Sequence, residues 1–321
     1  MDLMKSVCVH FIPRSSRRIA RKGQRGKRLM TTARRATSLK ELGAKMALMF
    51  DEEKQKEGLA IKLRPTDVVI SPFGKSGTTW TQMIVHTLRT RGDLDFDDIS
   101  RVVPWIETSP GLGIDLDAEQ KANPRAFKSH LGWDDMPRGG KYIIAIRDPK
   151  DAAYSMFKFM EGWFVEPGTI SVDEFVTKSV IGQGAYWKHL LSWWDRRTDD
   201  DVLLMVFEHM KKDLAGTIKK IAQFIDIRLD DDLLAITQTH ASLPFMQKHG
   251  NKFDDLLMRQ HSEKVAGIPP GGDSAKVRNG QVGEHKQHLS AETAAALDAV
   301  WTKEIAPKTG FADYAAMIAS L

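Results

Sequence analysis

The chain has 321 residues, enough for one large α/β unit or two small ones. Hydrophobic residues make up 42% of it and charged residues 28%, which excludes collagen-like, low-complexity and wholly disordered proteins. No apolar run approaches the ~20 residues of a membrane helix, so we expect no membrane span. The single cysteine, Cys8, cannot form an internal disulfide or a Cys-based zinc site, and it indicates a reducing, cytoplasmic setting.

The positive charge is concentrated at the N-terminus. Residues 1–40 contain 12 Lys and Arg and one acid, Asp2, and therefore carry +11, whereas the whole chain carries +5 and the remainder −6. We predict a basic, disordered arm over residues 1–37 and one folded domain over 38–321. The arm could be a solvated tail, a phosphate-contacting extension or an Arg-rich presequence.

The first half of the domain predicts a strand, a glycine loop and a helix. The sequence Ser-Leu-Lys-Glu from Ser38 predicts a capped helix that continues through Leu48 to Glu53. The β-branched run 67–71 predicts a strand, and the glycine-containing loop 74–79 leads into a helix over 80–89.

The second half continues the alternation of strands and helices. We predict strands at 126–130, 141–147 and 202–207, and helices at 150–160, 172–181, 185–196 and before Ile225. Apolar strands that alternate with helices favour an α/β domain with a parallel sheet covered by helices on both faces. Residues 262–288 are rich in glycine and lack periodicity, which predicts a functional loop.

The loop 74–79 predicts a phosphate site. A glycine turn between a strand and a helix presents amide N–H groups to an anion, and Ser76, Thr78 and Thr79 add hydroxyl donors. An ordinary strand–helix turn is the alternative. The loop is not a Walker A motif, because Lys75 precedes Gly77 instead of following it. ATP with magnesium is therefore disfavoured.

Two more basic segments could bind an anion. Arg147 ends a predicted strand and Ser155 lies in the following helix, at the sheet edge where α/β proteins bind ligands. The alternative is a surface ion pair of Arg147 with Asp148 or Asp151. The third segment, 278–286, lies in the glycine-rich loop and by itself indicates only a solvated loop.

His130 is the candidate general base. The two-residue period of a strand places Lys128 and His130 on one face at the same sheet edge. The alternative is that His130 caps the strand through a backbone hydrogen bond. No HExxH spacing or carboxylate cluster indicates a metal site.

Together these segments resemble the cytosolic-type sulfotransferases, which use 3′-phosphoadenosine 5′-phosphosulfate (PAPS). Residues 73–80 resemble the family's YPKSGTTW loop, 127–131 its FKTHLP segment and 147–155 its RNPKDxxxS element. Residues 207–211 resemble YEDMK, and 278–286 resemble the C-terminal RKGxxGDWK loop. The resemblance covers residues 60 to 310 approximately, so only the arm lies outside it.

The resemblance implies a P-loop-like domain with a parallel sheet of about five strands and no cofactor metal. His130 would be the general base, Lys75 would neutralise the leaving oxygen, and Lys128 would be a further catalytic residue. The donor, with adenosine 3′,5′-bisphosphate (PAP) as its product, would contact Lys75, Ser76, Gly77, Thr78, Thr79, Trp80, Arg147, Ser155, Phe207, Ser242, Arg278, Asn279 and Gly280.

Several residues depart from the family pattern. Gly74 replaces a proline, Phe207 a tyrosine that reaches the nucleotide, and Asn279 a basic residue beside the 3′-phosphate. Ala241 and Leu243 flank Ser242 where many members have Thr-Ser-Phe. The family's C-terminal dimer motif is not recognisable, so a homodimer stays open.

The resemblance also indicates the acceptor, a small and largely apolar alcohol, phenol or amine. The segments that line the acceptor side in relatives contain Trp105, Phe157, Phe159, Met160, Trp163, Phe164 and Phe245. Plain core is the alternative for these residues. A kinase on a P-loop-like fold and a nucleic-acid-associated protein binding through the arm are the alternative functions.

Overall fold

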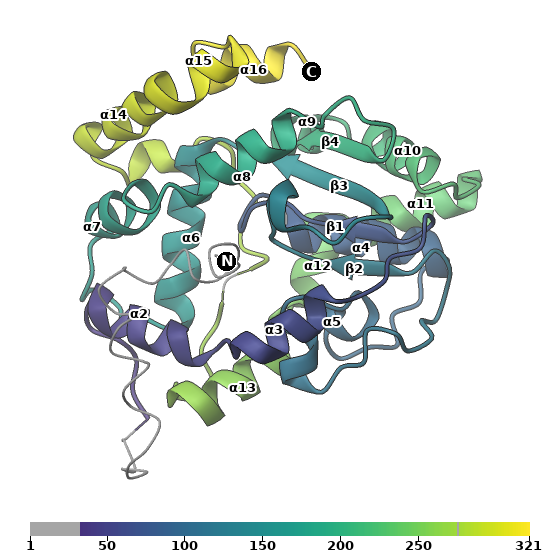
Figure 1. The fold of residues 1–321 in the computed structure, drawn as a ribbon, viewed down its shortest axis with the longest axis horizontal. Coiled ribbons are helices and arrows are strands. Elements are labelled where there is room, and N and C mark those ends of the chain that lie inside the picture. The colour runs from purple at the N-terminus through teal and green to yellow at the C-terminus, as the bar shows by residue number, and fades with distance from the viewer. Residues whose placement is uncertain (1–32, 275) are drawn as a thin grey trace.

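Four parallel strands form the centre of this computed structural model, which describes residues 33–274 and 276–321 (Figure 1). They are β1 (Val68–Ile70), β2 (Ala126–Lys128), β3 (Lys141–Ile146) and β4 (Val202–Val206), in the spatial order β2-β1-β3-β4. In register, Ile70 lies opposite Lys128 on one side and Ile143 on the other. The parallel α/β fold predicted from the sequence is confirmed.

The described sheet has one strand fewer than the expected five. Beyond β2, only Trp105 pairs with Lys128, as an isolated parallel bridge. The chain turns away directly afterwards, since the Ser109 amide donates to the Trp105 carbonyl at 2.9 Å. In the described chain, pairing beyond β2 is therefore limited to this single bridge and does not form a fifth strand.

Both faces of the sheet are buried. Val68 and Ile70 pack on helices α4 (Thr78–Thr90) and α10 (Leu214–Phe224). Val69, between them, packs on the opposite face in a cluster with Trp193 of α8 (Ala185–Trp194). Since successive side chains of a strand alternate between faces, burial on both sides explains the continuous apolar runs in the sequence.

The remaining helices surround this centre, with the C-terminal ones as an outer layer beside α8 (Figure 1). Their bounds are α2 Leu39–Leu48, α3 Glu52–Leu59, α5 Ile99–Val102, α6 Pro149–Trp163, α7 Val172–Phe175, α9 Phe207–Lys212, α11 Asp231–His240, α12 Leu243–Lys248, α13 Leu256–Ala266, α14 Ala291–Val300, α15 Ala306–Thr309 and α16 Tyr314–Ala319. Short 3₁₀ segments lie at Ser109–Leu112, Trp133–Asp135, Gly250–Lys252 and Glu284–Gln287, and π-helical turns at Val176–Ile181 and Trp301–Ile305.

Two predicted boundaries are wrong. Ser38 caps α2 as expected, but the helix does not continue to Glu53, because the Asp51 side chain accepts from two amides and starts α3. The predicted irregular segment 262–288 begins inside α13, which runs to Ala266. Its buried residues Met258, Ser262 and Ala266 recur every fourth position, a helical period that glycine content obscured.

The predicted arm lies almost entirely outside the described residues. Ala36, within its last positions, is buried and forms a parallel bridge with Val165. The boundary at residue 37 stays a prediction. In the part of the chain that the structure describes, no helix is long and apolar enough to cross a membrane.

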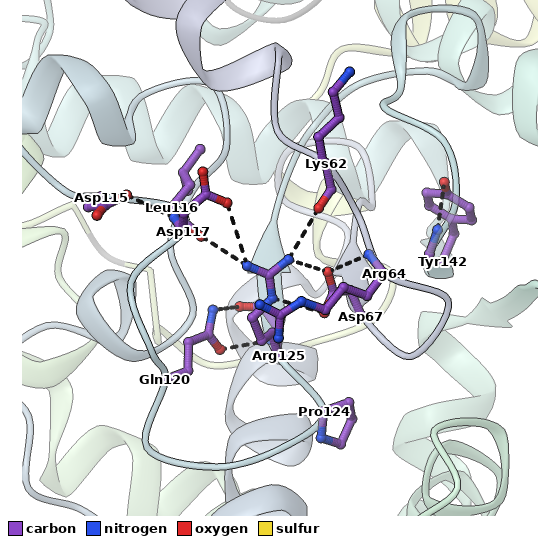
Figure 2. A network of polar contacts seen from close by, with 12 residues as sticks. Lys62, Arg64, Asp67, Asp115, Leu116, Asp117, Gln120, Pro124, Arg125 and Tyr142 are labelled. Carbon is purple, nitrogen blue, oxygen red and sulfur yellow. Dashed lines mark hydrogen bonds and ion pairs between the residues drawn. The ribbon is translucent and has the colours of Figure 1, made fainter.

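A buried ion pair ties the first two strands together at their N-terminal ends (Figure 2). Asp67 precedes β1 and Arg125 precedes β2, and the Arg125 Nε atom donates to Asp67 Oδ1 at 3.0 Å. The guanidinium also contacts the Lys62 and Leu116 carbonyls at 3.3 and 3.4 Å. This edge of the sheet is thus closed by paired groups.

Candidate active site

A cavity of about 1490 Å³ lies at the opposite edge, where the strands end. Its wall contains Lys75 after β1, Lys128 and His130 at the end of β2, Arg147 after β3 and Phe207 after β4. Ligands of open α/β sheets bind at this carboxyl edge. The volume exceeds the ~300–1000 Å³ of a site for one small ligand, so two ligands fit side by side.

The loop after β1 is shaped to receive an anion. Lys75 and Gly77 have φ angles of 68° and 96°, and these left-handed conformations turn the chain sharply into α4. Gly77 is the N-cap of α4 and supplies no side-chain acceptor, so the first amides of the helix point outward unpaired. The buried Ser76 and Thr78 hydroxyls also lack a partner among the described residues.

Arg147 joins three segments of the wall. Its two terminal nitrogens donate to the Lys75 and Gln281 carbonyls, each at 3.1 Å. Its guanidinium lies 4.5 Å from the centre of the Phe207 ring, and Nε has no partner among residues 33–274 and 276–321. The alternative surface ion pair with Asp148 or Asp151 is therefore wrong, because the side chain is buried and its terminal nitrogens donate to carbonyls.

The glycine-rich loop is anchored and does not hang free in solvent. Arg278 forms an ion pair with Glu284, and the Asn279 amide donates to the same carboxylate at 3.1 Å. Asp151 of α6 accepts from the Gly283 amide at 2.6 Å and from Nδ1 of His285 at 2.7 Å. These contacts hold Arg278 in the cavity wall, where its charge acts on Arg147.

His130 is arranged to accept a proton. Its Nδ1 lies 2.8 Å from the Pro72 carbonyl oxygen, which can only accept, so Nδ1 carries the hydrogen and Nε2 keeps a free lone pair. Burial, and then the Lys128 ammonium, hold the pKa of His130 well below 6.5. The ring is therefore neutral at pH 7.

Lys75 and Lys128 are cations held over aromatic rings. The Lys75 ammonium lies 4.7 Å from the Phe159 ring centre, and that of Lys128 lies 3.9 Å from Trp105. Neither lysine takes part in an ion pair in the described part of the chain. Burial lowers the pKa of Lys75 to about 7 and that of Lys128 to about 8, and an anion beside them would restore the charge.

Nearly all predicted donor-side residues line the cavity. The exception is Ser76, a residue of the loop that is fully buried and does not line the cavity. The residues in the wall are Lys75, Gly77, Thr78, Thr79, Trp80, Arg147, Ser155, Phe207, Ser242, Arg278, Asn279 and Gly280. Trp80 donates through Nε1 to the Ala241 carbonyl at 2.8 Å, which fixes its indole in the wall.

The predicted acceptor side needs two corrections. Trp105, Phe159, Met160, Trp163 and Phe164 line the cavity, but Phe157 and Phe245 do not. Phe157 points into the core, 5.8 Å from the Phe175 ring centre. Phe245 lies between two imidazoles, with ring centres 4.5 Å from His240 and 4.4 Å from His249.

Sequence reasoning missed part of this wall. Met46 lies in the last turn of α2, Met49 is the C-cap of that helix, and Met258 lies in α13. The buried pair Asp255 and Lys276 also lies there. Only Lys276 carried a signal, since it stands two positions before Arg278. Within the described residues, no group of three His, Cys, Asp or Glu could hold a metal ion.

Comparison with known proteins agrees with this geometry. The chain is 28% identical over 261 residues to the amine sulfotransferase of Oryctolagus cuniculus, covering 76% of this chain and 82% of the relative. It is 29% identical over 255 residues to sulfotransferase 2A1 of Rattus norvegicus, covering 76% and 86%. A mouse sulfotransferase solved in complex with PAP shares the fold, with TM-score 0.61, 23% identity and coverage of 80% and 90%.

A family model decides the assignment. The sulfotransferase domain model matches residues 65–309, a range that contains all four strands and every cavity segment from the loop after β1 to the glycine-rich loop. The chain therefore belongs to the sulfotransferase family of enzymes.

Proposed function

We propose that this enzyme transfers the sulfuryl group of PAPS to a hydroxyl or amine of a small, largely apolar acceptor. One observation carries the proposal. A single cavity is lined both by the start of α4, where the Thr78 hydroxyl has no partner among the described residues, and by the arginine pair Arg147 and Arg278. A nucleotide with anionic groups at two ends matches two such sites, and a mouse relative binds PAP, which has them.

The donor-side residues divide between the two ends. Ser76 and Thr78, with the first amides of α4, would hold the 5′-phosphosulfate. Arg147, Arg278 and Asn279 would hold the 3′-phosphate. Their partners in the structure are carbonyls and the Glu284 carboxylate. These partners hold the three side chains in the cavity wall. PAPS supplies an activated sulfuryl group whose leaving group is a phosphate.

His130 would activate the acceptor. Its Nε2 lone pair takes the proton of the acceptor hydroxyl as the oxygen bonds to sulfur. The sulfur–oxygen bond to the phosphate breaks, and its electron pair stays on the phosphate oxygen. The Pro72 carbonyl fixes the tautomer, and Trp105 packs against the imidazole with ring centres 5.2 Å apart.

Lys75 and Lys128 would stabilise charge that develops during transfer. Lys75 lies in the loop between β1 and α4, which would hold the phosphosulfate, so we assign its ammonium to the leaving oxygen. Lys128 shares the cavity with His130. Since a sulfuryl group carries less negative charge than a γ-phosphoryl group, ammonium groups and a helix N-terminus can provide this stabilisation.

The acceptor half favours an apolar molecule. Aromatic and methionine side chains, including Phe159, Trp163 and Met46, line the cavity together with charged residues such as Asp134 and Lys188. Such a wall buries apolar surface and leaves specificity to a few polar groups.

The proposal is tested first by donor binding. PAP should raise the thermal midpoint strongly at 100 times its Kd, equivalent to ~2.7 kcal/mol, whereas ADP and ATP should give much smaller shifts because each lacks a 3′-phosphate. Equal shifts with ATP and PAP would favour a kinase.

The base is tested by His130→Ala, which removes the only imidazole assigned to proton transfer. We expect the variant to fold and bind PAP like the wild type, and to lose transfer from PAPS by at least ~10². Wild-type kcat/KM should show its acidic limb below pH 6.5, since the pKa of His130 is held below that value. Near-normal turnover by the variant would leave His130 only as a strand cap.

A further inference from the structure

A third lysine, Lys276, faces the same cavity as Lys75 and Lys128. It comes from the glycine-rich loop and forms an ion pair with Asp255, the residue before α13. The side chains are buried, with exposed fractions of 10% for Lys276 and 4% for Asp255. Neither residue has a role in the function proposed above.

The Asp255 side chain lines the cavity and does not cap α13, the helix that it precedes. An aspartate at the N-cap normally accepts from the first amides of the helix, but the Asp255 side chain makes no such capping bond. Its backbone is also left-handed, with φ of 52°, a conformation that non-glycine residues seldom adopt and that gathers at functional sites. The structure therefore holds this carboxylate against Lys276 instead of against α13.

Asp255 shares the cavity wall with three lysines. The charges that keep the pKa of Asp255 low are, in order, those of Lys276, Lys128 and Lys75. Lys276 is also the neighbouring charge that most lowers the pKa of Lys75 and of Lys128. All three lysines therefore line one cavity together with Asp255, and their charges act on one another.

Lys276 keeps donors beyond its ion pair, because an ammonium has three N–H groups and Asp255 is its one partner among the described residues. Within the described residues, the ammonium makes no further ion pair beyond the one with Asp255. With three ammoniums and one carboxylate, the cluster carries a net charge of +2 when all are ionised. A phosphosulfate carries two negative charges, one on each half, so the two charges match.

We propose that Lys276 supplies a third ammonium to the sulfuryl oxygens during transfer, with Asp255 as the positioning residue that holds it there. The inference rests on the proposed function. Lys75 acts on the leaving oxygen, and Lys128 and Lys276 act on the oxygens that stay with sulfur. No proton or electron moves through Lys276, whose contribution is electrostatic.

The test compares PAPS with PAP, which differ only by the sulfuryl group. In acceptor-free buffer, Lys276→Met should weaken PAPS binding about tenfold, the scale of one charge-assisted contact, and should change PAP binding less than about twofold. Lys276→Arg should retain most of the PAPS affinity. The matched control Arg278→Met should weaken both ligands equally, because its site holds the 3′-phosphate.

Asp255→Asn tests positioning. It keeps the shape but removes the counter-ion, so we expect kcat with any acceptor used by the wild type to fall about threefold to tenfold while PAP affinity is unchanged. Unliganded thermal midpoints identify variants that fail to fold, and Lys276→Arg provides the folded comparison.

Two results would overturn the inference. Equal losses for PAP and PAPS in Lys276→Met would place Lys276 on the nucleotide. An effect confined to the acceptor KM would make it an acceptor contact. Failure of the wild type to bind either ligand would instead contradict the proposed function.

Discussion

The two ends of the strands differ in whether their buried charged groups are paired. At the amino edge, Arg125 and Asp67 are almost completely buried, with exposed fractions of 4% and 1%, and each satisfies the other (Figure 2). At the carboxyl edge, Arg147 is also buried and Lys75 is partly buried, but both line a cavity, and Arg147 Nε has no partner in the described chain. The paired charges at the amino edge stabilise the fold, whereas the unpaired groups at the carboxyl edge are available to bind a ligand.

The difference follows from strand direction. Carboxyl ends of parallel strands lead into helix N-termini, where free amides favour anions. Amino ends receive loops such as 62–67 and 115–125, whose carbonyls and carboxylates surround a guanidinium (Figure 2). We therefore expect substitutions at the amino edge to change stability and substitutions at the carboxyl edge to change binding.

The largest expected effect is on folding. Asp67→Asn leaves the Arg125 charge buried without its partner, and breaking one side of a buried pair costs about 3–5 kcal/mol of unfolding free energy. Urea denaturation of the unliganded protein measures it. Arg147→Met, which removes a buried arginine at the other edge, should stay within about 1 kcal/mol of the wild type. Similar losses in both variants would remove the distinction between the edges.

The second effect is on donor binding. Arg147→Met should weaken PAP by about 10- to 100-fold, since charge-assisted contacts to phosphate contribute ~1.5–3 kcal/mol. Binding of 5′-AMP, which lacks the 3′-phosphate, should change less than about threefold. Calorimetric titration of both nucleotides checks this, and equal losses would move Arg147 to the 5′ end. Asp67→Asn is the control that should leave both affinities unchanged under folding conditions.

The smallest expected effect is the uptake of a proton when PAP binds. The pKa of Lys75 is about 7 in the unliganded protein because its ammonium is buried, and a bound phosphate should raise that pKa. PAP binding near pH 7.5 should therefore take up a fraction of one proton, and affinity should fall as pH rises through 7. Titrations in buffers with different ionisation enthalpies measure the uptake, and Lys75→Met should abolish much of it. Uptake unchanged in that variant would assign the proton to another group.

The elements that could be predicted from sequence are those with a local cause. The apolar runs of β1, β3 and β4, and Pro149 at the first position of α6, needed no distant contact to be identified. The segment 49–51 was harder, because whether a chain continues a helix or restarts at Asp51 depends on one capping side chain. The predicted start of the glycine-rich loop at residue 262 was wrong, because the glycines beyond 266 hid the helical period of the residues before them.

The site was predictable where its residues lie next to strand ends. Lys75, Lys128, His130 and Arg147 each follow or end a strand, and parallel strands bring such positions to one edge. The acceptor wall was less predictable. Nothing local separates Phe157, which is buried in the core, from Phe159, two residues along the same helix, which lines the cavity.

The sequence by itself therefore determined the parallel sheet, the anion-binding loop and the family, because short-range spacing encodes strands, turns and signature motifs. Only the tertiary structure decided which charges are paired. Asp67 meets Arg125 across 58 residues, Asp255 meets Lys276 across a helix and a glycine-rich loop, and Arg147 reaches carbonyls 72 and 134 positions away. Those partnerships depend on how the chain packs, and they decide whether a buried charge stabilises the fold or remains available to a ligand.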